Sequence, residues 1–217
     1  MDQRPDIEKG NRKRSDNRSE QTRAKLLEIA RELFNEKGTA AVSTNHIAEA
    51  AGISIGNLYY HFKNREAFVL GLFEANAEET KVAFTPDPAA ALDLAALEKM
   101  VSANSKILWK YRFFYRELIA LINRDPELSR QYREHRDYGF QSFTGLLRAF
   151  AQFGVLRPIE SDAEAHRLAV IVWMVSEFYI QFLESDSKAF PEDYAASGAA
   201  ILRQVLTPFL VEVENHA

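Results

Sequence analysis

The stretch Ser54–Phe62, SIGNLYYHF, decides how the rest of the chain is interpreted. Its last four positions all carry rings, and they closely follow a glycine and an asparagine. Rings at this density fit a core, a ligand pocket or an external binding surface. If the stretch is a helix, Leu58 and Phe62 share one face because they are four residues apart. That face is expected to be buried, which leaves the other positions for external contacts.

The flanking residues predict a second short helix just upstream. It runs from about Thr44 to Ala50 with Ser43 or Thr44 as its N-cap, and Ser54 caps the next helix, which ends near His61. Two short helices joined through a glycine turn, here Gly52, are typical of a helix-turn-helix, although such pairs also occur without any DNA-binding role. The second helix of this motif enters the major groove of DNA.

The residue types in this second helix suit DNA. Asn57 can pair bidentately with adenine, and Ile55 can contact a thymine methyl group. Lys63 and Arg65 are charged partners for phosphates. In isolation a histidine among aromatic residues, such as His61, is more often packed than functional. A disordered basic tail is likewise the commoner interpretation of the run from Lys9 to Arg14, against an arm in the minor groove.

Composition places the chain among globular proteins. It has 217 residues, 47% of them hydrophobic and 12% aromatic, and a net charge of −4. Residues 1–65 contain 12 Lys/Arg and nine Asp/Glu, a net charge of +3, whereas residues 66–217 contain 15 and 22, a net charge of −7. This asymmetry fits a polyanion partner for the first part, or a solvated basic tail.

Several function classes find no support in the sequence. Without cysteine there is no disulfide, thiolate zinc site or thiol nucleophile. The five histidines are too dispersed to predict a metal site, and no catalytic motif or cofactor-binding loop occurs. No uninterrupted apolar run approaches about 20 residues, and the first residues lack an apolar signal core. We expect a cytoplasmic protein with no cofactor, no metal, no enzymatic activity and no membrane association.

Residues 22–71 resemble the DNA-binding domain of the TetR family of bacterial transcriptional regulators. The resemblance rests on Leu26-Leu27, Leu33-Phe34, Gly38, Ile47-Ala48, Ala51-Gly52-Ile53-Ser54, Gly56, Leu58-Tyr59, His61-Phe62 and the Lys63–Glu66 helix start. It covers about a quarter of the chain, and many family members carry Lys or Pro where this chain has Ile55. The rest of the chain is similar to the family only in its helical layout and length.

The resemblance implies a role for each position of the motif. Ser43 and Thr44 would hold a phosphate at the start of the first motif helix, and Asn45 would face the groove. Base contacts would come from Ile55, Gly56 and Asn57, and backbone contacts from Tyr59, Tyr60, His61, Lys63 and Arg65.

An all-α architecture is predicted for the whole chain. We expect a disordered polar extension at residues 1–20, a helix-turn-helix domain at 21–68 and a helical regulatory and dimerisation domain at 69–217. The first helix should begin near Thr22, and Pro191 should open the last one.

The larger domain holds three aromatic-rich stretches, which build a helical core and are also candidates for an apolar ligand pocket. The pocket candidates are Trp109, Phe113, Glu117, His135, Tyr138, Phe143, Glu177 and Phe178. The family forms dimers through its last two long helices, and an intrachain core is the alternative use of the same residues. The predicted interface comprises Val172, Val175, Tyr179, Phe182, Ala195, Gly198, Ala199, Leu202, Val205 and Leu206.

The function that these features favour is a ligand-responsive transcriptional regulator, most often a repressor in this family. Its partners would be a palindromic double-stranded DNA operator, an apolar or amphipathic small-molecule effector and a second copy of the chain. The effector would act by tilting the helix from about Asn64 to Phe84. The alternatives are a helical-bundle carrier of lipids or small molecules, an enzyme, and a DNA-binding protein that responds to no ligand.

Overall fold

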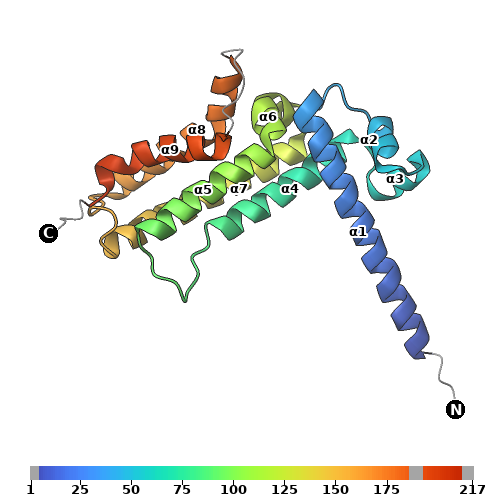
Figure 1. Ribbon diagram of the computed structural model, residues 1–217, viewed down its shortest axis with the longest axis horizontal. Helices are drawn as coiled ribbons and strands as arrows, with labels where there is room; N and C mark the ends of the chain where they lie inside the picture. The colour runs from blue at the N-terminus through green and yellow to red at the C-terminus, as the bar shows by residue number, and fades with distance from the viewer. Residues whose placement is uncertain (1–4, 186–192, 212–217) are drawn as a thin grey trace. The chain divides into compact units, whose positions relative to one another are not determined.

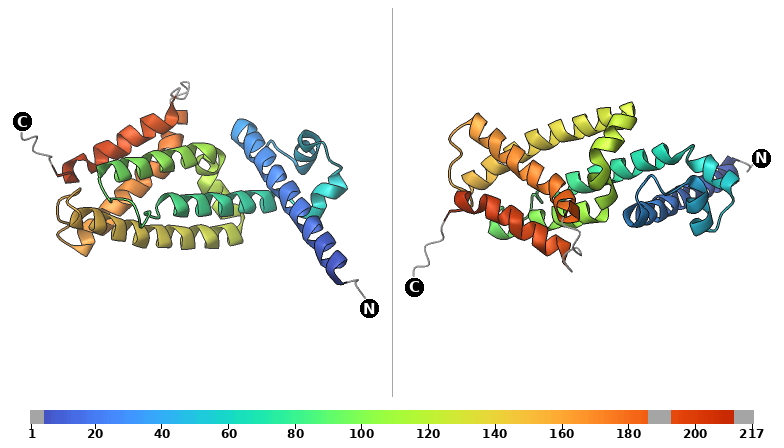
Figure 2. Two further views of the ribbon diagram at one scale, coloured as in Figure 1. Left: turned by 60° about the horizontal axis from the view of Figure 1, so that its bottom comes forward. Right: turned by 90° about the horizontal axis from the view of Figure 1, so that it is seen from above.

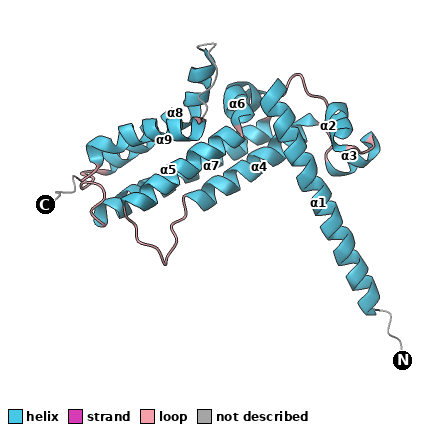
Figure 3. Cartoon of the chain, in the orientation of Figure 1, coloured by secondary structure: helices cyan, strands magenta, loops and turns pink. Residues whose placement is uncertain are grey.

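The computed structural model describes residues 5–185 and 193–211. Within these ranges it contains helices and no β-strand, as the sequence predicts (Figure 3). The chain divides into two compact units, Met1–Leu72 and Phe73–Ala217, with the division inside one helix. The sequence-based boundary at residue 68 lies four residues earlier in the same helix.

The first unit contains α1 (Pro5–Lys37), α2 (Thr44–Ala51), α3 (Ile55–His61) and the beginning of α4 (Arg65–Ala83) (Figure 1). Helix α1 packs on α2, and α2 packs on α3. Their shared core consists of Leu26, Ala30, Phe34, Val42, Ile47, Ala48, Ala51, Leu58, Phe62, Phe68, Val69 and Leu72. Helices as short as α2 and α3 are marginal in isolation, so this core is what holds them in place.

Helix α1 begins much earlier than the sequence predicts. It starts at Pro5 rather than near Thr22, so residues 5–20 of the predicted extension are helical in the structure, and residues 1–4 lie outside the described residues. Proline suits the first helical position because its fixed φ matches the helix. Adding a residue to an existing helix is also much cheaper than nucleating one, so the packed half can extend toward the N-terminus.

Glycine ends α2 where the chain must turn sharply. Gly52 has φ 68°, a left-handed conformation, and its N–H donates to the carbonyl oxygens of Ala48 and Glu49. Residues with a Cβ rarely adopt this conformation. The glycine therefore sets the angle at which α3 follows α2.

The second unit contains the end of α4 with α5 (Leu94–Lys110), α6 (Arg112–Arg124), α7 (Pro126–Gln152), α8 (Asp162–Ser185), α9 (Tyr194–Leu206) and the short 3₁₀ helix η1 (Thr207–Phe209). Asp93, Asp125 and Asp193 each cap the helix that follows. The predicted start at Pro191 lies outside the described residues. Helix α5 packs on α9 and α7 on α8, with α6 against both α7 and α8 (Figure 2).

The end of α4 is bound to this unit by polar contacts. Glu79 accepts hydrogen bonds from Lys110 Nζ and from the Tyr111 hydroxyl, both at 2.7 Å. Asn76, which is buried, donates to the Tyr115 hydroxyl at 2.8 Å. These contacts fix the last turns of α4 against α5 and α6.

Helix α8 is long and apolar enough to cross a membrane by length and composition alone, although the sequence has no uninterrupted apolar run of that length. Its described residues pack against α5, α6, α7 and α9. Part of its surface is buried inside this unit, including the carboxylate of Glu177. A core helix of a globular protein has these properties.

Candidate nucleic-acid interface and effector cavity

A capping box closes the start of α2. Ser43 Oγ accepts from the backbone N–H of His46, and His46 Nδ1 accepts from the backbone N–H of Ser43, each at 3.3 Å. The first turn of α2 has no acidic residue, and Asn45 is exposed there. The partial positive charge of this helix end is therefore not neutralised by an acidic side chain of its own first turn. A capping box usually has glutamate or glutamine at this position, so the role of His46 does not follow from the sequence pattern.

Helix α3 divides into a buried side and an exposed side. Leu58 is completely buried and Phe62, which stacks on Phe68, is nearly so. Opposite them, Tyr60 is 78% exposed. Ser54 caps the helix by accepting from the Asn57 N–H at 3.2 Å. The structure therefore buries Leu58 and Phe62 and exposes the opposite side of the helix, which is the arrangement that the sequence predicts.

The exposed end of α3 has the steric character of a surface that approaches another molecule. Ile55, Gly56 and Asn57 are all exposed, and a Cβ added at Gly56 would meet nothing within 4 Å. No acidic residue occurs between Ala50 and Arg65. A polyanion can therefore approach this edge without meeting a like charge from the same segment.

Three of the predicted contact residues also have partners inside the unit. Thr44 Oγ1 and the Tyr59 hydroxyl lie 3.3 Å apart and connect α2 to α3. Arg65 donates to the Thr39 carbonyl oxygen at 3.2 Å and pairs with Glu66. Lys63, in contrast, is exposed, and His61 is half-buried with its ring perpendicular to that of Tyr60. Lys63 is thus better placed than Arg65 for an external phosphate.

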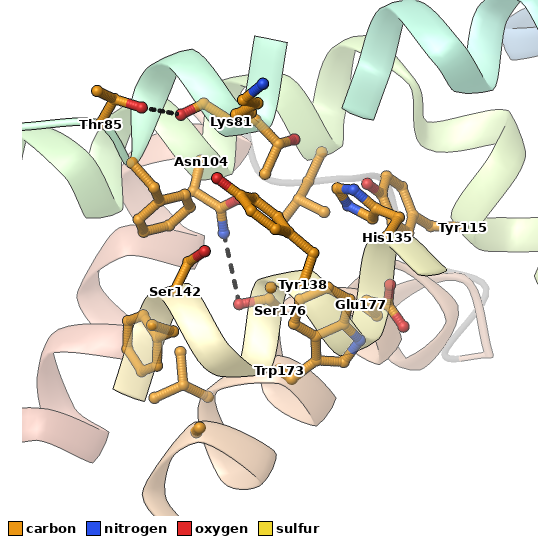
Figure 4. A pocket seen from close by; sticks show the side chains of 17 residues that line it. Lys81, Thr85, Asn104, Tyr115, His135, Tyr138, Ser142, Trp173, Ser176 and Glu177 are labelled. Carbon is orange, nitrogen blue, oxygen red and sulfur yellow. Dashed lines mark hydrogen bonds between the residues drawn. The ribbon is translucent and has the colours of Figure 1, made fainter. Parts of the chain in front are cut away.

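A cavity of about 100 Å³ lies within the second unit, between α4, α5, α6, α7 and α8 (Figure 4). Its apolar wall includes Phe84, Leu108, Phe143, Ala169, Val172 and Trp173. Its polar groups are Thr80, Lys81, Thr85, Asn104, Tyr115, His135, Tyr138, Ser142, Ser176 and Glu177. Apolar walls with a few polar groups are typical of small-molecule sites.

The polar groups at this cavity are partly shielded from water. Burial raises the pKa of Glu177 from 4.5 to about 7, and the nearby Tyr132, Trp173 and Arg136 oppose that rise. Tyr132 donates to Glu177 Oε2 at 2.6 Å. Burial also lowers the pKa of His135, so its neutral form is favoured. The cavity therefore combines a carboxyl group that resists ionisation with a neutral imidazole.

The structure brings together half of the predicted ligand-binding residues. His135, Tyr138, Phe143 and Glu177 line the cavity, and the other four do not. Trp109 stacks on Tyr194 at 4.8 Å, Phe113 is completely buried in the core, Phe178 is 41% exposed on α8, and Glu117 is half-buried on α6. Aromatic density identified the right helices, but it does not specify which face of each helix meets the cavity.

The sequence analysis did not identify several cavity residues, because their residue types do not by themselves indicate a ligand site. Asn104 donates to Ser176 Oγ at 3.5 Å, and both residues are buried. Gly139 is another: a Cβ there would lie 2.3 Å from Trp173 Cζ3. A glycine within a long helix is the one signal that points to such a close approach.

The predicted dimer-interface residues have varied surroundings. Leu202 and Leu206 are buried inside the unit, Gly198 is buried against Ser105, and Val172 lines the cavity. Tyr179 and Ser197 share a hydrogen bond of 2.7 Å. Val175, Ala199 and Val205 are half-buried, and Phe182 is 69% exposed. The side chain of Ala195 lies outside the described part of the structure.

The exposed apolar side chains of α8 form a stripe next to the predicted interface residues of this helix. Ile171, Met174, Phe178 and Phe182 are all more than 40% exposed, and they recur every three or four residues. Helix α8 is apolar on most sides, so its sequence alone does not distinguish the stripe that faces the core from the one that remains exposed.

Among the described residues, no group of three His, Cys, Asp or Glu side chains is arranged to hold a metal ion.

Comparison with known proteins agrees with this organisation. Residues 26–72 match the model of the bacterial regulatory proteins of the tetR family, and residues 76–217 match a model described as bacterial transcriptional repressor. The HTH-type transcriptional regulator AcrR of Shigella flexneri is 28% identical over 165 residues, which cover 71% of this chain and 74% of AcrR. The HTH-type transcriptional repressor KstR2 of Rhodococcus jostii is 36% identical over 83 residues, 38% of this chain and only 41% of that relative.

A solved structure extends the similarity over most of the chain. A TetR-family transcriptional regulator from Marinobacter aquaeolei VT8 superposes with a TM-score of 0.75 at 29% identity, covering 87% of this chain and 91% of that one. The relatives are transcriptional regulators rather than enzymes. With both of its units matched by family models, the chain belongs to the TetR family and is a ligand-responsive, DNA-binding transcriptional regulator.

Proposed function

We propose that this regulator is a repressor that binds a palindromic operator as a homodimer in the bacterial cytoplasm and releases it when a small molecule occupies the cavity of the second unit. The observation that carries the proposal is the two-sided character of α3. Leu58 and Phe62 hold the helix on its domain, while the opposite, acid-free edge is exposed. An edge of this kind fits the major groove.

The exposed residues at the start of α3 and those at and after its end have different roles in this proposal. Asn57 reads a base edge, for which adenine is the bidentate partner, and Ile55 contacts a thymine methyl group. Tyr60 and Lys63 contact phosphates, which position the helix without reading sequence. Arg65 keeps its contact with Thr39 and orients the loop before α2.

The DNA-binding proposal is tested by first selecting genomic fragments with the full-length protein and then measuring operator affinity by fluorescence anisotropy. Asn57→Ala should lose about 1–3 kcal/mol of preference for the selected operator over a scrambled duplex. Lys63→Ala should weaken both duplexes alike and reduce the dependence on salt by about one phosphate contact. Asn123→Ala, an exposed asparagine on α6, is the control. If Asn57→Ala leaves the sequence preference unchanged, α3 does not read bases through this residue.

The dimer is proposed to form through the exposed stripe of α8, defined by Ile171, Met174, Phe178 and Phe182. An apolar stripe of this size is costly to leave in water. A dimer also has a functional reason, because two recognition helices read two half-sites about 34–36 Å apart or a multiple of that spacing.

The dimer surface is tested by light scattering on gel-filtered protein. The double substitution Met174→Glu and Phe178→Glu should give a monomer, because two carboxylates would have to be buried at the interface. Ile119→Glu, at a residue of similar exposure on α6, should remain dimeric. A dimer that survives the double substitution would place the interface elsewhere.

The cavity is proposed to act through α4, whose residues Thr80 and Lys81 line it together with Phe84 just beyond the end of the helix. A ligand shifts the population of DNA-binding forms only if it binds one form better than the other. Coupling of about 1–3 kcal/mol is typical of such systems. A chain that binds operator but responds to no compound that occupies the cavity would instead be a ligand-independent DNA-binding protein.

A further inference from the structure

The cavity contains one buried carboxyl group and no buried cationic side chain. Glu177 is only 5% exposed, whereas Lys81, the cationic side chain of the lining, is exposed on α4. Figure 4 shows Lys81 at the edge of the site opposite Glu177. Water therefore screens the lysine far more than the carboxylate. The charge that a bound ligand meets inside the cavity is the negative one.

Glu177 has incomplete compensation for that charge. Tyr132, a neutral donor, donates a hydrogen bond to it, and burial has a larger effect on its ionisation than the nearby Arg136 guanidinium. A buried carboxylate that forms no ion pair is costly. A ligand that brings its own positive charge next to Glu177 removes part of this cost, so binding and ionisation favour each other.

The walls of the cavity suit the same kind of ligand. Trp173 lies within 5.8 Å of His135, measured between ring centroids, and Tyr138 and Phe143 add two further rings to the lining. Ring faces attract cations, most strongly once both partners have lost water. The volume of about 100 Å³ is of the order of cavities that accept a single aromatic ring.

We propose that the cavity is a site for a small lipophilic monocation, in the simplest case a single-ring amine. The Glu177 carboxylate holds its ammonium group, and Trp173, Tyr138 and Phe143 enclose its apolar part. The proposal rests on the proposed function in so far as it names the effector class of the same cavity. Binding of anionic amphipaths is disfavoured, because they would place a second negative charge beside Glu177.

Gly139 sets the shape of this site. Because a Cβ there would lie 2.3 Å from Trp173 Cζ3, any larger residue displaces the indole from its position against α7. Gly145, on the same helix, has nothing within 4 Å of the corresponding position. The two glycines thus form a matched pair, one that shapes the cavity and one that does not.

The test uses isothermal titration calorimetry on the full-length protein with three probes that share one ring: phenethylamine, 2-phenylethanol and 3-phenylpropionate. At pH 8 the amine should bind at least about tenfold more tightly than either of the others, since one compensated pKa unit corresponds to about a tenfold change in affinity. Glu177→Gln should abolish this preference and leave the affinity for the alcohol unchanged. Equal or tighter binding of the alcohol or the carboxylate, or no binding by any probe, overturns the proposal.

A second readout is the pH dependence of amine binding. The titratable or charged groups that act on Glu177 or line the same cavity are Tyr132, His135 and Arg136 from α7, Tyr115 from α6 and Lys81 from α4. With a Glu177 pKa of about 7, the ionised fraction rises from about one tenth at pH 6 to about nine tenths at pH 8. Amine affinity should therefore rise about tenfold over this range in the natural protein and stay flat in Glu177→Gln. A similar rise in both proteins would assign the effect to another group and overturn the role of Glu177.

The glycine pair tests the walls independently of charge. Gly139→Ala should lose binding of both the amine and the alcohol, and Gly145→Ala should retain both; retained binding in Gly139→Ala overturns the assignment of the Trp173 wall. Operator affinity, measured separately, distinguishes the two proposals. An amine that binds with the expected selectivity but leaves operator affinity unchanged refutes its effector role while the ligand class stands.

Discussion

The buried carboxylate of Glu177 makes the stability of the protein depend on pH in a direction opposite to that of a paired surface acid. Its pKa is about 7 in the folded state and 4.5 as a reference value. The folded protein therefore holds this proton more tightly than the unfolded chain. The stabilising effect is fully present below about pH 4.5 and is lost as the pH rises through 7.

The size of the effect follows from the shift. A difference of about 2.5 units at about 1.4 kcal/mol per unit gives a cost of about 3.5 kcal/mol for the ionised form. Glu177→Gln removes the titration but keeps an oxygen that can accept from Tyr132. The free energy of unfolding of the variant, relative to that of the natural protein, should thus increase by about 2.5 kcal/mol between pH 5 and pH 8, because the rest of the effect has already developed below pH 5.

Urea denaturation at fixed protomer concentration measures this difference at pH 5, 6, 7 and 8. His135 also titrates with a shifted pKa, since burial favours its neutral form and costs stability as the pH falls. It is present in both proteins, so its contribution largely cancels in the difference. A difference between the two proteins that is independent of pH would refute the conclusion that burial governs Glu177.

Two further predictions concern the first unit. Leu58→Ala should reduce the free energy of unfolding by about 2–5 kcal/mol, because it leaves a cavity beneath α3, and operator binding should be lost at temperatures where circular dichroism still reports a folded second unit. Gly52→Ala should cost about 1 kcal/mol from its φ of 68° alone, since a Cβ there meets nothing within 4 Å, and its unfolding midpoint should fall without a change in urea m-value.

The helix-turn-helix could be predicted from the sequence because the residues that define it act on the backbone close to them. Ser43, Ser54 and Gly52 each act on the backbone within three or four residues, so their effects do not depend on distant parts of the chain. Leu58 and Phe62 were placed correctly for the same reason, because their spacing puts them on one face of a short helix. The structure adds the histidine partner of the capping box and the internal contact of Arg65.

The cavity and the exposed stripe of α8 could be predicted only in part from the sequence, because both depend on which helix faces pack against each other. His135 and Glu177 were predicted and line the cavity, but Phe113, equally aromatic in its surroundings, points into the core. Phe178 was assigned to the pocket and lies instead on the exposed stripe. In a helix that is apolar on most sides, periodicity identifies no single inner face.

The contacts of α4 give the proposed response a physical route. Tyr115 lines the cavity and accepts a hydrogen bond from Asn76, while Glu79, one turn further along α4, is held by Lys110 and Tyr111. A ligand that repositions Tyr115 must break or carry along its bond to Asn76. We propose that, because α4 is continuous from Arg65 to Ala83, a shift in its last turns is transmitted along the helix to Phe68, which stacks on Phe62 at the end of α3. The required coupling of about 1–3 kcal/mol is comparable to one or two hydrogen bonds gained or lost, so these few contacts are sufficient to bias the equilibrium.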